Sequence, residues 1–194
     1  MHRAMSTLCR PAIADVTNPP DWPNTPLSGK GTGMQRRRTG DGFMRCADGH
    51  VRWGVFGAAG VVFVWRDPAA LAAEPLVMLQ MRSAFAHEGG TWSCAGGALD
   101  EGELPYEGAL REASEEVGTV PAAHRVTGEY VFTPAADWSY TTVVVEVDEL
   151  FGESMNFETD DVEWVPVDLV DRRPLHPGFA AAWPHVRAII EQSA

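Results

Sequence analysis

The chain has 194 residues, a hydrophobic content of 45% and a formal net charge of −12. This length suits one domain of ordinary size with an extension, and the hydrophobic content is enough for a sizeable core. The acidic balance argues against a general nucleic-acid-binding protein, which needs a basic surface to neutralise phosphates. We therefore expect a small anionic ligand as the partner and no nucleic acid.

Targeting and redox signals are weak. No apolar run approaches the eighteen or more residues of a membrane span, and the N-terminus lacks the apolar core of a signal peptide. We expect no membrane partner and a cytoplasmic location. Cys9, Cys46 and Cys94 are too few and too scattered for a disulfide framework or a Cys-rich zinc site.

Residues 1–39 are expected to form an irregular, flexible N-terminal extension, and residues 40–194 the folded domain. The first segment is rich in Pro, Gly, Ser and Thr and has no sustained helix or strand period. A basic triplet at 36–38 closes it, and we favour a solvated triplet over a contact with an anionic partner. Met34 is an alternative start.

The first features of the folded domain are a hairpin and two strands. Cys46 and His50 form a Cys-x3-His pattern, but without a second ligand pair it favours a hairpin that turns at Asp48-Gly49 over a zinc site. The apolar runs at 61–65 and 76–81 predict buried strands, and Arg82 follows the second one directly.

Residues 105–117 are predicted to form an amphipathic helix. Pro105 suits the first turn, and Gly118 suits the position just past the C-terminus. An apolar stripe and an acidic cluster then lie roughly 140° apart around the helix axis. The stripe consists of Leu110, Ala113 and Val117, and the cluster of Glu112, Glu115 and Glu116.

The acidic cluster needs a counter-charge. Three neighbouring carboxylates repel one another, and the nearby basic residue is Arg111. One interpretation is a solvated, Glu-rich surface helix. The alternative is a bound divalent cation, because hard oxygen ligands suit Mg²⁺ or Mn²⁺, which also bind substrate phosphates.

The C-terminal part continues the alternation of strands and helices. Residues 130–147 supply further strand material, 164–167 a late strand, and 179–190 a closing helix that is interrupted or started at Pro184. Aromatic residues that could stack on a base, or simply pack in the core, are Phe85, Trp92, Trp138 and Tyr140. We interpret His87 and His176 as structural.

Residues 97–118 as a whole resemble the Nudix box. They read Gly97-x5-Glu103-x7-Arg111-Glu112-x2-Glu115-Glu116-x-Gly118. This resemblance to the Nudix hydrolase (MutT-like) family covers roughly residues 55–190. It implies an α/β fold, the Nudix α/β/α sandwich with a mixed β-sheet between helices. It also implies pyrophosphohydrolase activity: divalent-metal-dependent hydrolysis of the diphosphate linkage in a nucleoside diphosphate derivative.

The resemblance also implies roles for the box residues. Glu112 and Glu116 would be the main metal ligands, and Glu115 a further ligand or a group that organises water. Gly97, together with Gly96, would let the backbone approach the Mg²⁺ or Mn²⁺ ion, one of the two through its carbonyl. Glu103 would pair with or orient Arg111, and both would belong to the catalytic set with Glu115 and Glu116.

Residues outside the box are predicted by looser patterns. The general base is either a box glutamate or an acid from a later loop. The loop candidates are Glu153, Glu158, Asp160 and Asp161. Glu158 stands out because it lies six residues before Trp164, as in many relatives. Arg82 is a candidate phosphate clamp. Trp92, Trp138 and Tyr140 are candidate substrate contacts.

Some positions depart from the usual family pattern. Ala113 and Thr119 stand where a larger aliphatic residue is usual, and Ala95 stands where a proline often precedes the glycine pair. These departures concern packing and loop stiffness more than the chemistry.

The leading function is hydrolysis of a nucleoside triphosphate of the oxidised or deoxy type. One alternative is an ADP-ribose or dinucleotide pyrophosphatase, which a homodimer would favour. An alternative of another class is a non-catalytic Nudix domain that senses a nucleotide. RNA decapping ranks third, because the chain is acidic and has no evident RNA-binding extension.

Overall fold

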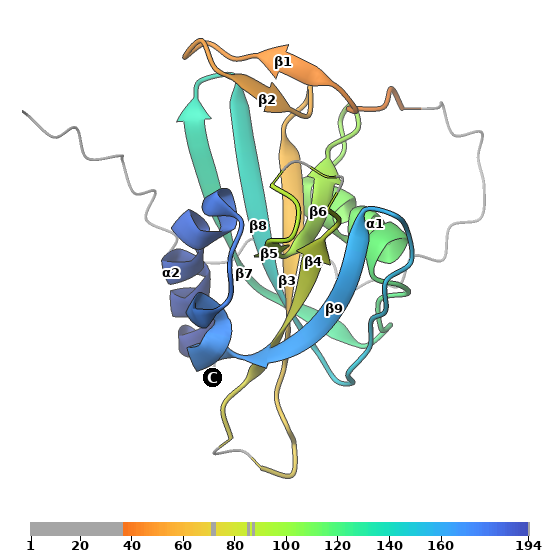
Figure 1. The fold of residues 1–194 in the computed structure, drawn as a ribbon, viewed down its shortest axis with the longest axis vertical. Coiled ribbons are helices and arrows are strands. Elements are labelled where there is room, and N and C mark those ends of the chain that lie inside the picture. The colour runs from red at the N-terminus through yellow and green to blue at the C-terminus, as the bar shows by residue number, and fades with distance from the viewer. Residues whose placement is uncertain (1–36, 71–72, 85, 87, 194) are drawn as a thin grey trace, which may run out of the picture.

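The structure is a computed structural model that describes residues 37–70, 73–84, 86 and 88–193 (Figure 1). The predictions for Met34, Arg36, Phe85, His87 and nearly all of the N-terminal extension lie outside these residues. Arg37 and Arg38 form exposed ion pairs with Glu107 and Glu101, at 3.3 and 3.9 Å.

The predicted hairpin is confirmed. β1 (Phe43–Arg45) and β2 (Val51–Trp53) form a separate two-stranded antiparallel sheet. Gly49 has a φ of 85° in the turn, a conformation that glycine adopts without steric cost. The backbone of Cys46 pairs with His50, and the Cys46 side chain is buried whereas that of His50 is exposed. The Cys-x3-His segment therefore serves as a turn.

The described residues also form a seven-stranded sheet, which is mixed as expected. Its strands are β3 (Ala58–Trp65), β4 (Leu76–Arg82), β5 (Trp92–Ser93), β6 (Ala95–Ala98), β7 (His124–Ala135), β8 (Trp138–Val147) and β9 (Thr159–Pro166). β3 is central, runs parallel to β8, and pairs antiparallel with both β4 and β6. β9 pairs with β4 on the opposite side from β3, and β7 pairs with β8.

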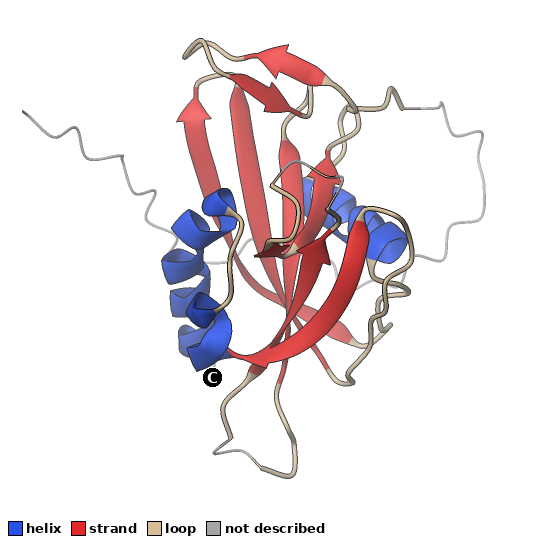
Figure 2. Cartoon of the chain, viewed as in Figure 1, coloured by secondary structure: helices blue, strands red, loops and turns tan. Residues whose placement is uncertain are grey.

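The two helices cover opposite faces of this sheet (Figure 2). Alternate side chains of β3 point to opposite sides. Val62 and Val64 pack in the core beneath α2 (Pro177–Gln192), while Val61 and Phe63 pack beneath α1 (Pro105–Glu116). This is the α/β/α sandwich that the resemblance implies.

Several element boundaries differ from the expectations. The late strand expected at 164–167 is β9, which begins at Thr159 and ends at Pro166. The strand material at 130–147 is a hairpin whose first strand begins earlier, at His124. A 3₁₀ helix, η1 (Val167–Arg172), precedes α2 and had no signal in the pattern. Pro184 lies inside α2, which starts at Pro177 instead. No described helix is long and apolar enough to cross a membrane.

Candidate functional site

The box helix α1 packs closely on the sheet through small residues. Ala109, Ala113 and Val117 are fully buried, and Leu110 is partly buried against the same core. Pro105 occupies the first turn, as predicted. The small side chains, including the departure at Ala113, let the helix axis lie near β3 and β6. The acidic residues of the helix are thereby brought against the glycine pair.

Arg111 ties the loop before the helix to the helix itself. Its Nε and Nη2 donate to the two carboxylate oxygens of Glu103, at 3.0 and 2.9 Å, and Nη2 also donates to the Ala98 carbonyl at 2.9 Å. The Glu103 side chain is 5% exposed. Burial alone would raise its pKa, but the hydrogen bonds from Arg111 and from the Asp100 N–H leave that pKa lowered. Glu103 thus pairs with Arg111 and fixes the orientation of its guanidinium.

Glu116 is the most enclosed acid of the box. It is 5% exposed, and its Oε2 accepts hydrogen bonds from the Gly96 N–H at 2.9 Å and from Gln80 Nε2 at 3.1 Å. Burial raises its pKa to about 7, and the charges of Glu112 and Glu158 add to that rise. The alternative interpretation of the acidic cluster as a solvated surface is therefore wrong for Glu116, because the last turn of α1 directs this residue inward between β4 and β6.

Glu112 lies against Gly97. A Cβ atom at position 97 would come within 2.5 Å of the Glu112 Cδ, so glycine is required there for this carboxylate to keep its place. Arg111 Nη1 donates to Glu112 Oε1 at 2.8 Å. Burial nevertheless raises the pKa of Glu112. The glycine pair and the two acids therefore form one compact group.

Glu115 does not join this group. Its side chain is 60% exposed, and its nearest basic partner is Arg111 at 3.8 Å. Among the described residues, no three His, Cys, Asp or Glu side chains converge closely enough to hold a metal ion by themselves. The arrangement offers two carboxylates, those of Glu112 and Glu116, beside the half-buried backbone of the glycine pair.

These donors fit a hard divalent cation. Both carboxylates have raised pKa values, which means that their negative charges lack sufficient stabilisation in the metal-free chain. None of the described basic side chains pairs with Glu116. The gap that a Cβ at Gly97 would fill lies directly against the Glu112 carboxylate. Carboxylate and carbonyl oxygens in this setting suit Mg²⁺ or Mn²⁺.

Glu158 is the loop acid whose charge reaches the box. It is exposed, and its charge contributes to the raised pKa of Glu116. Its backbone carbonyl accepts from the Ser83 N–H at 2.8 Å, which ties the loop to the end of β4. Glu153 instead follows the C-terminus of α1, where its N–H donates to the Val117 carbonyl. Asp160 and Asp161 lie in β9 rather than in a loop. The Asp160 carboxylate accepts from the Ala84 N–H at 3.1 Å, and the Asp161 carboxylate accepts from the Val162 N–H at 2.8 Å.

The charges of Arg82 and Glu116 both act on Tyr140. Burial raises the pKa of Tyr140 well above its usual value and that of Cys94 to about 12, and the nearby Arg82 charge partly offsets both rises. The charge of Glu116 acts on the same two groups. The Tyr140 hydroxyl lies 3.9 Å from Cys94 Sγ. Arg82, Tyr140 and Glu116 therefore lie within range of one another's electrostatic effects.

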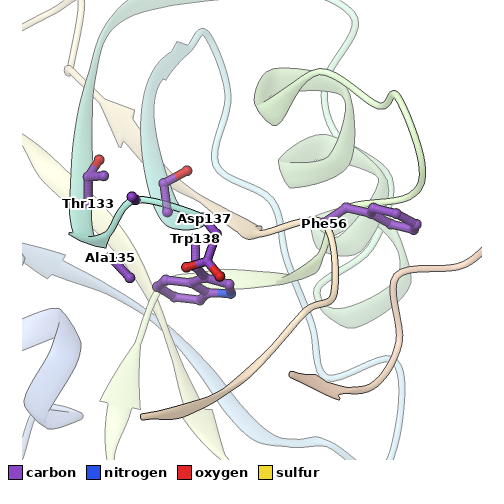
Figure 3. A pocket seen from close by; sticks show the side chains of 7 residues that line it. Phe56, Thr133, Ala135, Asp137 and Trp138 are labelled. Carbon is purple, nitrogen blue, oxygen red and sulfur yellow. The ribbon is translucent and has the colours of Figure 1, made fainter. Parts of the chain in front are cut away.

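The two tryptophans predicted as substrate contacts, Trp92 and Trp138, lie apart from the box acids. Trp92 is 7% exposed in the core beneath α2, and the guanidinium of Arg173 lies 5.4 Å from its ring centre. Trp138 donates from Nε1 to the carbonyls of Trp53 and Gly54, both at 3.1 Å, and so supports the β1–β2 hairpin. Trp138 also lines an open pocket of about 290 Å³ at the turn between β7 and β8 (Figure 3).

Two buried polar residues of the site were missed by the sequence reasoning. Gln80 donates to Glu116, and its own carbonyl oxygen accepts from the Thr159 hydroxyl at 3.1 Å. The available signal was the position of Gln80 in an otherwise apolar strand, because a buried amide needs hydrogen-bond partners. Thr159 had no comparable signal. His176 caps α2 by accepting from the Gly178 N–H, which agrees with a structural role.

Comparison with known proteins agrees with this geometry. The family model for the NUDIX domain matches residues 56–186. The chain belongs to the Nudix hydrolase family. It is 40% identical over 160 residues to a Mycobacterium tuberculosis protein named "Putative 8-oxo-dGTP diphosphatase 3", a match that covers 79% of this chain and 71% of the relative. This Nudix chain is accordingly a pyrophosphohydrolase.

Two further Nudix relatives extend the comparison. A Nudix hydrolase from M. smegmatis, RenU, has a crystal structure with 36% identity and a TM-score of 0.65; the match covers 79% of this chain and 96% of RenU. A nucleoside triphosphate pyrophosphatase/Nudix hydrolase fusion protein of Bifidobacterium longum is 39% identical over 160 residues. That match covers 80% of this chain but 32% of the fusion protein, so this Nudix chain corresponds to about a third of it.

Proposed function

We propose that this Nudix hydrolase cleaves a diphosphate linkage of a nucleoside triphosphate in a divalent-metal-dependent reaction, with an oxidised deoxynucleotide such as 8-oxo-dGTP as the leading substrate. The observation that carries the metal dependence is the Glu116 carboxylate. It is buried, has no basic partner among the described residues, and has a pKa raised to about 7. The name of the M. tuberculosis relative supports the choice of substrate.

The residues that would hold Mg²⁺ are Glu112 and Glu116, with a backbone carbonyl of Gly96 or Gly97 and with Glu115 as a further ligand or water-organising group. When bound, the ion would supply charge neutralisation at the phosphate oxygens and a more acidic bound water. Mn²⁺ offers the same octahedral, oxygen-rich chemistry. Glu115 would need to turn inward from its present position 3.8 Å from Arg111, where its side chain is 60% exposed.

Other side chains of the site would position the metal ligands, accept a proton and neutralise phosphate charge. Arg111, fixed by Glu103, holds the Glu112 carboxylate over Gly97. Glu158 is the proposed general base, because it is solvent-exposed, its charge acts on Glu116, and an acid in such a position can accept the proton of an attacking water. Arg82 supplies a positive charge at the end of β4, where it would neutralise substrate phosphate.

Tyr140 is the proposed contact for the rest of the nucleotide, because it lies near both Arg82 and Glu116. Trp92 and Trp138 are less suited to that role in this structure. The first is enclosed in the core, and the second uses its N–H to hold the hairpin. The pocket beside Trp138 is a separate surface at the turn of β7 and β8.

The test is product release from a nucleotide panel with Mg²⁺ or Mn²⁺, comparing the native chain with Glu116→Gln. The panel contains 8-oxo-dGTP, the dNTPs, ADP-ribose, NADH and diadenosine polyphosphates. We expect metal-dependent turnover of 8-oxo-dGTP that falls by more than about 100-fold in the variant, since even outer-shell partners of metal ligands cost 10–100-fold. The matched control is Glu149→Gln, an exposed acid in the loop after β8.

The other outcomes separate the alternatives. Preferential turnover of ADP-ribose or of the dinucleotides would replace the triphosphate substrate by those of a dinucleotide pyrophosphatase. Nucleotide binding without turnover at any metal concentration would indicate a non-catalytic sensor. Equal turnover by the native chain and Glu116→Gln would contradict the proposed metal site.

A further inference from the structure

Three buried polar side chains form a continuous hydrogen-bonded row beneath the glycine pair. Thr159, Gln80 and Glu116 are 3%, 2% and 5% exposed. The Thr159 hydroxyl lies 3.1 Å from Gln80 Oε1, and Gln80 Nε2 lies 3.1 Å from Glu116 Oε2. The row connects the start of β9 to the end of the box helix through β4.

The row sets which end of the Gln80 amide faces the acid. A hydroxyl can donate to the amide oxygen, and a carboxylate can accept only from the amide nitrogen. With Thr159 at the oxygen, the NH₂ group is directed to Glu116, and its nitrogen also lies 3.5 Å from the Cys94 carbonyl. A reversed amide would place two acceptor oxygens against each other and leave both unsatisfied in a buried site.

Both hydrogen-bond donors to the Glu116 carboxylate contact the same oxygen. The Gly96 N–H and Gln80 Nε2 both donate to Oε2, at 2.9 and 3.1 Å. Among the described residues, no donor contacts Oε1. The carboxylate is thus held by one oxygen while the other remains available.

The same row is coupled to the Glu158 loop. Thr159 follows Glu158 directly and pairs with Arg82 across the β4–β9 ladder, where the register shifts between Met81 and Arg82. The Glu158 carbonyl accepts from the Ser83 N–H. Thr159, which orients Gln80, and Glu158, whose charge acts on Glu116, therefore occupy adjacent positions of one anchored segment.

We propose that Gln80 and Thr159 are positioning residues for the Nudix reaction, which hold Glu116 by Oε2 so that Oε1 is presented to the metal. This inference rests on the proposed function, because it takes Glu116 to be a metal ligand. Gln80 acts on Glu116 directly, and Thr159 acts through Gln80.

The experiment measures Mn²⁺ binding to the full chain without nucleotide, by electron paramagnetic resonance of the free ion. The variants are Gln80→Met, Thr159→Val, Thr159→Ser and the double variant Gln80→Met/Thr159→Val. Thr127→Val is the matched control, because Thr127 is a hydroxyl-bearing strand residue of β7 that bonds the Val144 carbonyl. Urea unfolding of each variant identifies loss of folded protein.

We expect Gln80→Met to weaken Mn²⁺ binding by about 10-fold or more, as outer-shell partners commonly do. Thr159→Val should weaken it less, and Thr159→Ser, which retains the hydroxyl, should restore affinity to within about twofold of native. The double variant should be no weaker than Gln80→Met, since two residues that act through one contact are not additive. The kcat should fall with Mn²⁺ affinity while the KM for nucleotide changes little.

Unchanged Mn²⁺ affinity in folded Gln80→Met, or additive effects in the double variant, would overturn the inference. If Gln80→Met fails to fold, the contrast between Thr159→Val and Thr159→Ser decides it, and equal affinities of those two variants would reject it. The proposed function fails separately, when Glu116→Gln binds Mn²⁺ as tightly as the native chain.

Discussion

The carboxylate of Glu112 lies directly against Gly97, where a Cβ atom would come within 2.5 Å of its Cδ. The neighbouring glycine has a different constraint. A Cβ on Gly96 would come within 2.4 Å of the Ala59 carbonyl oxygen and of the Gly60 Cα, which are backbone atoms of β3. Gly97 therefore leaves room for the movable side chain of Glu112, whereas Gly96 leaves room for the backbone of β3.

Gly97→Ala should abolish most activity while leaving the fold intact. The new methyl group displaces the Glu112 carboxylate, which can move because it is the far end of a flexible side chain. We expect an activity loss of about 10–100-fold or more and a change in the free energy of unfolding below about 1 kcal/mol. Steady-state kinetics and urea unfolding measure the two quantities.

Gly96→Ala is the comparison for that experiment. Its methyl group meets backbone that cannot move without disturbing the β3–β6 pairing, so we expect a destabilisation of about 2 kcal/mol or more. If Gly97→Ala were as destabilised as Gly96→Ala, the assignment of Gly97 to the site rather than to the fold would be wrong.

Glu103→Gln should destabilise the protein through Arg111. The substitution removes the charge from a buried two-point ion pair and leaves the guanidinium with one fewer anionic partner. We expect a loss of about 2–4 kcal/mol in the free energy of unfolding, the range for breaking a buried pair, reduced because Arg111 is partly exposed. Chemical denaturation measures it, and Glu107→Gln, whose partner Arg37 is exposed, should change stability by less than about 1 kcal/mol.

The metal-free protein should lose stability as the pH rises from about 5 to 7.5. The pKa of Glu116 is 4.5 in its ordinary state and about 7 in the folded chain, so the folded state binds this proton more tightly than the unfolded state. The associated stability is fully present below pH 4.5 and is lost as the pH rises through 7. The pKa difference corresponds to about 3 kcal/mol.

Urea unfolding in the presence of a chelator, at several pH values, tests this expectation. Glu116→Gln cannot ionise and should have a flatter profile than the native chain over the same range. Parallel profiles of the two proteins would show that Glu116 does not titrate in this window. Adding Mn²⁺ should stabilise the native chain most at the alkaline end, where the carboxylate is charged.

Arg82→Gln should weaken substrate binding more than it affects folding. The lost positive charge lies at the end of β4, near Tyr140 and Cys94. We expect a KM for the triphosphate that rises about 10-fold, as for the loss of one charge-assisted hydrogen bond, with Mn²⁺ affinity unchanged. Isothermal titration and kinetics measure these values, and an unchanged KM would remove Arg82 from the proposed phosphate contacts.

Local patterns predicted the box helix well, and they predicted long-range contacts poorly. Pro105, Gly118 and the apolar spacing place α1 within one residue of its observed end, because helix caps and periodicity are properties of neighbouring residues. The pairing of β4 with β9 joins Gln80 to Thr159, which are 79 residues apart. No spacing rule reports such a contact before the strand order is known.

The aromatic candidates illustrate the same limit. Trp138 followed a loop-like segment and was a reasonable base-stacking residue, but its N–H reaches the carbonyls of the β1–β2 hairpin, 84 and 85 residues away. The enclosed position of Glu116 was also missed. The helical wheel gives the direction of a side chain around the axis, whereas burial depends on what lies on that side.

The segment between β8 and β9 is fastened at both ends. Its first part is hydrogen-bonded to the end of α1. The backbone N–H groups of Glu153 and Met155 donate to the carbonyls of Val117 and Glu116, respectively. The side-chain amide of Asn156 donates to the carbonyl of Glu115. A few residues later, Glu158 and Thr159 are anchored to β4. An inserted or deleted residue between these anchors would have to shift either the helix end or the strand. This stretch should therefore have a constant length wherever the hydrolase evolves new substrates, and variation in length should be confined to other connections of the sheet.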